Sequence, residues 1–177
     1  QIDSSDSTNI VRNIILGKIV NSRNILTRAA RNTTEEKASI LKEQAEKLLE
    51  QENSLETAKT IDSIRGIEGA AATIYFRAFD SMLKTEETEM MFEKRSRRPP
   101  ENRVNALLSF VYMLLKNDTQ SALESVGIDP SAGYLHTLRP GRPSMALDLM
   151  ESITPIFQSF YPGYRGINFP FIKIYII

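Results

Sequence analysis

Residues 33–51 read TTEEKASILKEQAEKLLEQ, and this stretch decides the fold class. Its first four residues, Thr33 to Glu36, have the spacing of a capping box, which is typical of a helix start. The positions that follow are rich in Glu and Lys, which favours a solvent-exposed face. Apolar residues recur among them at steps of three and four, as on one face of a helix: Ala38, Leu41, Ala45, Leu48 and Leu49. The stretch is therefore predicted to be an amphipathic helix.

The same periodicity extends over most of the chain. Further helices are predicted from near Ser7, after Ser54, from near Ile64, from Glu101, from Asp118 to Val126 and from Pro143 to Glu151. Consecutive prolines make Pro99-Pro100 a loop, and Gly127 is a predicted C-terminal cap. We predict an all-α, multi-helix domain over residues 1–160. Residues 161–177 are apolar and β-prone and are expected to form a separate, atypical tail.

The composition excludes several classes of protein. With 177 residues, 41% of them hydrophobic and 25% charged, the chain fits one soluble domain with its own core. Its 22 basic and 22 acidic residues cancel, so binding a polyanion would require a local basic patch. The absence of cysteine excludes disulfides and thiolate metal sites. No apolar run approaches the ~20 residues of a membrane helix, and no signal peptide is evident, so a cytoplasmic protein is expected.

The single histidine, His136, stands among other chemically active side chains. Residues 133–151 read GYLHTLRPGRPSMALDLME and include Arg139, Arg142, Asp148 and Glu151. Carboxylates suit a hard divalent cation, and one imidazole shifts the preference toward Mn²⁺. Such a metal polarises a phosphodiester, while arginines bind its phosphate oxygens. The group points to metal-dependent chemistry on a polyanion.

A metal in this group would need another carboxylate from elsewhere in the chain. Glu68 is the best candidate, because it lies among small and apolar residues in IRGIEGAAA, residues 64–72. An unpaired buried carboxylate is unfavourable, so it should meet a cation or a metal. Each residue also has a simpler interpretation. A lone histidine is often structural, an i,i+3 acidic pair is often solvated, and Glu68 could be stabilised by a helix N-terminus.

A second cluster is basic. Residues 94–103 carry five cations and one glutamate in a neutral chain, and two further arginines lie beside His136. Such clusters bind phosphate backbones through charge and counterion release. DNA contacts are therefore predicted from Arg95, Arg97, Arg98, Arg103, Arg139 and Arg142. The alternative is a solvated loop, or salt bridges to the acidic helix predicted at residues 33–51.

The helix after this loop carries a polar stripe of Asn105, Ser109, Tyr112 and Lys116 at three- and four-residue spacing. The stripe could line a cleft in which Tyr112 stacks on a base, so Asn105 and Tyr112 join the predicted DNA contacts. It could equally be the solvent face of the helix.

Three blocks of sequence occur in a fixed order. They are IRGIEGAA around Glu68, RSRRPPENRVNALLSF from Arg95 to Phe110, and residues 133–151 with their GYLH and LDLME ends. Together they resemble the C-terminal helical domain of the CRISPR-associated adaptation integrases, metal-dependent endonucleases that insert new spacers. The resemblance covers roughly Asn9 to Ile156. The middle block is most similar to the subtype I-C branch.

The resemblance implies that Glu68, His136 and Glu151 are ligands of Mn²⁺ or Mg²⁺, with Asp148 in a supporting catalytic role. It implies a reaction in which the 3′-hydroxyl of captured DNA attacks a repeat phosphodiester beside the leader. One phosphodiester replaces another, so no nucleotide cofactor is needed. In the family, two integrase dimers are bridged by a dimer of a small ferredoxin-like partner protein.

The chain departs from the family at both ends. The family's dimer-forming N-terminal β domain has no counterpart here, and residues 158–177 do not continue the expected basic helical C-terminus. A truncated integrase is therefore expected. Two other functions fit the same residues. One is a repair nuclease acting on branched DNA, which would run the reverse of integration. The other is a metal-free helical DNA-binding or assembly module in which His136 is only structural.

Overall fold

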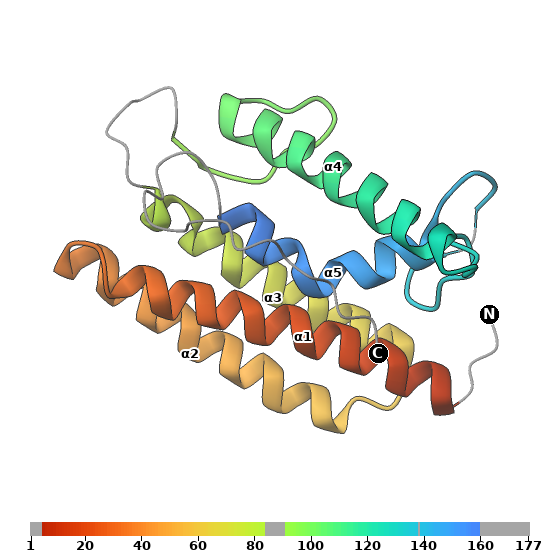
Figure 1. Ribbon diagram of the computed structural model, residues 1–177. Helices are drawn as coiled ribbons and strands as arrows, with labels where there is room; N and C mark the ends of the chain where they lie inside the picture. Colours follow the sequence, from red (N-terminus) through yellow and green to blue (C-terminus); the bar gives the residue numbers. More distant parts are fainter. Residues whose placement is uncertain (1–4, 84–90, 138, 160–177) are drawn as a thin grey trace.

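The described part of the chain is helical. The computed structural model describes residues 5–83, 91–137 and 139–159 (Figure 1). No strand occurs among these residues, so the all-α prediction is confirmed. None of the described helices is both long and apolar enough to cross a membrane. The predicted tail at 161–177 lies outside the described residues. The helices are α1 (Ser5–Ala30), α2 (Glu35–Thr57), α3 (Ile61–Met82), α4 (Arg103–Ser125) and α5 (Ser144–Ser159).

Helix α1 is the centre of the packing. It contacts α2, α3 and α5, while α2 also packs on α3 and α4 packs on α5. Figure 1 shows α4 and α2 on opposite sides of the molecule, with α1, α3 and α5 between them. Helix α5 therefore joins α4 and the loops beside it to the three-helix bundle.

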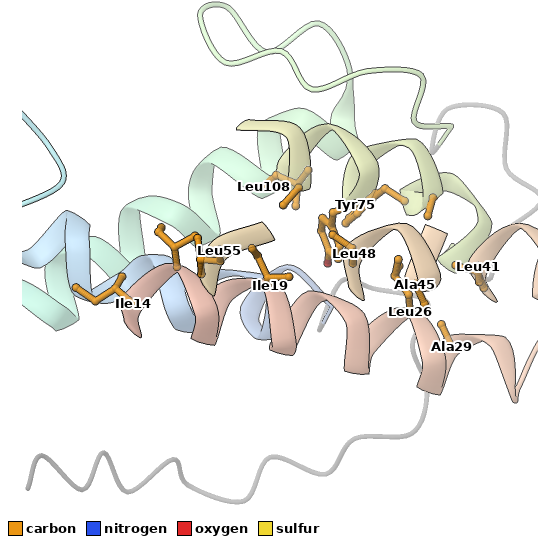
Figure 2. Close-up of a cluster of buried hydrophobic side chains, with 14 of the residues drawn as sticks. Ile14, Ile19, Leu26, Ala29, Leu41, Ala45, Leu48, Leu55, Tyr75 and Leu108 are labelled. Atoms are coloured by element: carbon orange, nitrogen blue, oxygen red, sulfur yellow. The ribbon is translucent and has the colours of Figure 1, made fainter. Parts of the chain in front are cut away.

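The main core fills the space between α1, α2 and α3 and includes Val104 and Leu108 at the start of α4. Figure 2 shows side chains from all three helices directed into this interior, among them Ile19, Leu48 and Tyr75. A smaller cluster of Leu115, Leu147 and Met150 joins α4 to α5. These apolar contacts exclude water over the length of each helix and are the main source of stability. Fully buried residues of the main core include Val11, Ile15, Ile19, Leu26, Leu41, Leu48, Leu55 and Ile64.

The prediction of a capping box at the start of α2 is wrong. Thr34 is the N-cap residue, but its side chain makes no capping hydrogen bond. The capping box lies instead at the start of α3, where the Thr60 hydroxyl accepts from the Ser63 backbone N–H at 3.2 Å. Leu49 also differs from the prediction: it is 41% exposed, because the adjacent Leu48 takes the inward position.

Two predicted helix boundaries are wrong. No separate helix begins after Ser54, because α2 continues to Thr57 and α3 starts at Ile61. No break occurs near Asp118 either, and α4 runs from Arg103 to Ser125 without interruption. The continuity of α4 has a clear cause: Leu115, Thr119 and Leu123, at steps of four, are all buried. Helix α5 likewise continues for two turns beyond Glu151, through Pro155 to Ser159.

The predicted cap at Gly127 is confirmed. Its φ is +77°, in the left-handed region that favours glycine. The Gly127 N–H donates to the Glu124 carbonyl at 3.1 Å, and the Ile128 N–H donates to the Leu123 carbonyl at 3.0 Å. This pair of bonds is a Schellman motif, which satisfies carbonyls at the end of the helix.

Gly127→Ala should lower the free energy of unfolding by about 1 kcal/mol, because a Cβ is unfavourable at positive φ. Gly66→Ala is the matched control. Gly66 is an exposed position inside α3, and a Cβ added there meets nothing within 4 Å, so this variant should be slightly more stable than the parent. Urea denaturation measures both. Equal stability of the two variants would contradict the capping role of Gly127.

Candidate active site

The buried carboxylate of Asp148 organises the loop that carries His136. Asp148 lies on α5 and is fully buried. It accepts backbone hydrogen bonds from Tyr134 at 2.5 Å, Leu135 at 2.8 Å and His136 at 3.0 Å. These three N–H groups satisfy a charge that would otherwise be very unfavourable in the interior. Asp148 is therefore a positioning residue beneath the site, with its oxygens already occupied.

The same carboxylate also orients the imidazole ring. The Nδ1 atom of His136 lies 2.7 Å from Oδ1 of Asp148. An ionised carboxylate accepts hydrogen bonds only, so Nδ1 carries a proton, and in the neutral ring Nε2 keeps its lone pair. A histidine held in this way has a fixed ring orientation and can present Nε2 to a metal ion.

The His136 loop is also fixed from two other directions. A Cβ at Gly133 would lie 2.5 Å from the carbonyl carbon of Ser144, so only glycine lets the loop approach the start of α5 this closely. From α3, the Arg65 side chain donates to the Leu135 carbonyl through Nε at 3.0 Å and again through Nη2. Sequence reasoning did not identify either residue. The sequence offered one indication for Arg65, namely its position one helical turn before Glu68.

The structure brings the three predicted ligands together. Glu68 from α3, Glu151 from α5 and His136 line one cavity of about 180 Å³. His136 Nε2 lies 3.9 Å from Oε1 of Glu151. The cavity is partly enclosed, since the Glu68 and Glu151 side chains are 27% and 13% exposed. Residues separated by 83 positions in the sequence thus converge on one small polar space.

A lysine that the sequence analysis missed stands between the two glutamates. Lys18 of α1 donates to Oε2 of Glu151 at 2.6 Å and also to Oε1 of Glu68. Burial alone would lower the pKa of Lys18, but attraction from Glu151 and Glu68 outweighs it and raises the pKa. The ammonium is therefore charged at neutral pH. The sequence offered one indication of this role: Lys18 lies at helical spacing between Ile15 and Ser22, on the buried face of α1.

The donor atoms fit a hard divalent cation, although their present arrangement does not form a metal cluster. Two carboxylates and one neutral imidazole suit Mn²⁺ or Mg²⁺. Within the described residues, however, no group of three or more Asp, Glu or His side chains stands close enough together to hold a metal ion. The Lys18 ammonium contacts one oxygen of each glutamate.

A cationic groove adjoins this cavity. It has a volume of about 870 Å³, and its predicted DNA-contacting residues are Arg95, Arg97, Arg98, Tyr112, Arg139 and Arg142. Arg95, Arg97 and Tyr112 also line the smaller cavity, so the two spaces share a wall. The Arg97 guanidinium lies 5.8 Å from the centre of the Tyr112 ring, within the range of a cation–π contact.

Two predicted DNA contacts have structural partners instead. Asn105 is fully buried, so the prediction of a direct DNA contact is wrong for this residue. Its Oδ1 accepts from the Ser96 backbone N–H and from Arg95 Nη1, both at 2.9 Å, and its Nδ2 donates to the Lys94 carbonyl at 2.8 Å. Burial, together with repulsion from Arg97, lowers the pKa of Arg95 to about 10. Both side chains hold the basic loop against α4.

The other two basic residues of the segment 94–103 are Lys94 and Arg103. Arg103 is exposed at the start of α4 and does not line the groove. Within the loop, Lys94 and Glu101 form an ion pair at 3.5 Å. The alternative of salt bridges between this loop and α2 has no support in Figure 1, because α2 lies on the other side of the bundle from α4.

Comparison with known proteins identifies the family. The family model of CRISPR associated protein Cas1 matches residues 1–160. A CRISPR-associated endonuclease Cas1 of Leptospira interrogans is 47% identical over 150 residues, which cover 84% of this chain and 59% of that protein. One from Moorella thermoacetica is 46% identical over 155 residues, which cover 87% and 45% of the two proteins.

Solved structures agree with this result. A Cas1 protein from Thermotoga maritima has a TM-score of 0.75 and 29% identity, covering 95% of this chain and 51% of that one. A chain of a Cas6-RT-Cas1–Cas2 complex has a TM-score of 0.79 and 25% identity, covering 95% and 18%. The chain belongs to the Cas1 family, as the three sequence blocks predicted. It spans about half the length of the curated relatives it matches.

Asp148→Asn should lower the free energy of unfolding by about 1–3 kcal/mol, because an amide nitrogen cannot accept the hydrogen bonds that the carboxylate accepts. His136 is the only histidine, so its ring nitrogens give unambiguous NMR signals. The parent should show the Nδ1–H tautomer, and the variant should lose this preference. Asp118→Asn, at an exposed position on α4, is the control and should change neither quantity. An Nε2–H tautomer in the parent would contradict the assignment.

Proposed function

We propose that the chain is the catalytic domain of a metal-dependent DNA endonuclease and integrase, which inserts protospacer DNA into a CRISPR array. One observation carries the proposal: Glu68, His136 and Glu151, from three distant segments, line one cavity beside an arginine-lined groove. The relatives support it, since several are CRISPR-associated endonucleases.

The residues have separate roles in this proposal. Glu68, Glu151 and Nε2 of His136 would hold Mn²⁺ or Mg²⁺. A cation bound there would polarise the scissile phosphodiester and neutralise charge in the pentacovalent transition state. Asp148 keeps the His136 lone pair directed at the cavity through the contact at Nδ1. The partly enclosed cavity limits water, which strengthens each electrostatic interaction.

The groove would bind the DNA backbone beside the metal. Arg97, Arg98, Arg139 and Arg142 offer cations to phosphate oxygens, and Tyr112 offers an aromatic face to a base. The reaction is a transesterification. A bond forms between the incoming 3′ oxygen and phosphorus as the bond to the leaving 3′ oxygen breaks. The incoming hydroxyl loses a proton and the leaving 3′ oxygen takes one up. The number of phosphodiesters is unchanged.

We propose the same partners as for the family. Cas1 occurs in solved complexes together with Cas2, and we infer a small ferredoxin-like partner of this kind and a homodimer for the full-length protein. Because the proposed target is a CRISPR array, we infer a cytoplasmic location. The subtype I-C assignment rests on the block from Arg95 to Phe110 and belongs to this proposal.

Glu68→Ala and Glu151→Ala should each abolish metal-dependent strand transfer into leader–repeat DNA in the full-length protein, because each removes a metal ligand. Duplex binding should stay close to that of the parent. An integration assay with and without the partner protein measures the first effect, and a filter-binding assay measures the second. Glu124→Ala, on the exposed face of α4, is the matched control and should retain activity.

Calorimetric titration with Mn²⁺ separates this proposal from a metal-free DNA-binding module. His136→Ala should weaken Mn²⁺ binding by tenfold or more, about 1.4 kcal/mol. Binding as tight as in the parent would refute the assignment of the ligands. Cleavage of branched DNA without any integration would favour the repair nuclease instead.

Reversing the charge of Arg97 and Arg98 together should weaken DNA binding for all sequences. The dependence of log affinity on log salt should become shallower by about two, since two phosphate contacts are lost. The control is Arg28→Glu with Arg31→Glu. Arg28 lies in the last turn of α1 and Arg31 directly after it, and both are exposed and do not line the groove. An unchanged salt slope in the Arg97/Arg98 variant would show that these arginines do not contact phosphate.

A further inference from the structure

Lys18 forms a bridge between the two glutamates of the candidate metal site. It projects from α1, whereas Glu68 belongs to α3 and Glu151 to α5. The Lys18 ammonium contacts one oxygen of each glutamate, and its side chain is only 14% exposed. One cation thus joins three helices at the point where two carboxylates face the same cavity.

The charges of the site require a cation at this point. Glu68, Glu151 and the buried Asp148 carry three negative charges within one small region, and His136 in its neutral form offsets none of them. Like charges at short range in a partly dry environment are strongly unfavourable. Arg95 and Arg97 also line the cavity. Among the contacts of the described residues, the positive charge that meets both glutamates is that of Lys18.

A divalent cation would be held by the same two carboxylates. Lys18 contacts one oxygen of each, so an ion held by both glutamates would stand close to the ammonium. The two cations also repel each other, so they cannot share the position. Lys18 has four rotatable side-chain bonds, and the cavity of about 180 Å³ offers space into which its ammonium can move.

We propose that Lys18 is an internal counterion that holds Glu68 and Glu151 in place until a metal ion displaces it. Lys18 then acts as a positioning residue, and metal binding is an exchange of one cation for another. Metal affinity is lower than the three ligands alone would give, while the metal-free site stays ordered. This inference rests on the proposed metal site and concerns a residue outside the predicted ligand set.

Lys18→Met tests the exchange, because methionine keeps the length of the side chain and removes its charge. Metal-free protein is prepared with a chelator and titrated with Mn²⁺ by calorimetry, and thermal unfolding is recorded with and without Mn²⁺. The variant should unfold several degrees below the parent without metal. It should bind Mn²⁺ about tenfold or more tightly, and Mn²⁺ should raise its Tm by more than that of the parent.

Lys47→Met is the charge-matched control. Lys47 pairs with Glu43 on the exposed face of α2, so this variant loses the same charge away from the site and should match the parent in Mn²⁺ affinity. Lys18→Gln is a second variant, in case methionine prevents folding. Its amide can still donate hydrogen bonds to the glutamates but carries no charge, so its Mn²⁺ affinity should also rise.

The outcomes separate this inference from the metal site itself. Mn²⁺ affinity in both Lys18 variants equal to or weaker than in the parent would overturn the counterion role and leave the metal site intact. A destabilised variant with unchanged affinity would show a purely structural lysine. Failure of the parent and of both variants to bind Mn²⁺ or Mg²⁺ would overturn the metal site, and the exchange with it.

Discussion

Three backbone N–H groups converge on the buried carboxylate of Asp148, and the functional end of the molecule depends on this interaction. A charge in the interior is tolerated only when it is fully hydrogen-bonded, and here the loop before α5 supplies the donors. The requirement works in both directions. The carboxylate needs the loop for its solvation. The described residues of the loop form no helix or strand, and the loop takes its conformation from the carboxylate. These hydrogen bonds therefore fix the position of His136.

The site is consequently a product of tertiary structure. Its side chains come from α1, α3, α5 and the loop, and no two of the three ligands are neighbours on one helix. The apolar core of α1, α2 and α3 sets the distance between Lys18 and Glu68. The small cluster between α4 and α5 then places the arginines of the groove against this bundle. Packing far from the chemistry thus determines the geometry of the charged groups.

The helical periodicity was sufficient to predict the fold class, because buried residues such as Leu41 and Leu48 repeat at the period of a helix. The periodicity was insufficient to predict where the helices end. Asn117 and Asp118 are of the type that favours caps, yet the buried face of α4 continues past them. The resemblance to the family indicated Glu68, His136 and Glu151 as a set. The sequence could not reveal that Asn105 is buried or that Lys18 meets two glutamates, because local spacing carries no information about contacts across helices.

Arg65 and Glu68 lie one turn apart on α3, and this has a mechanical consequence. Arg65 holds the Leu135 carbonyl, next to His136, while Glu68 points into the cavity. The N–H of the same Leu135 donates to Asp148 on α5, so this short loop ties α3 to α5. A shift of α3 relative to α5 would strain these hydrogen bonds. The loop therefore limits changes in the distance between Glu68 and Glu151, as a strut between the two helices does.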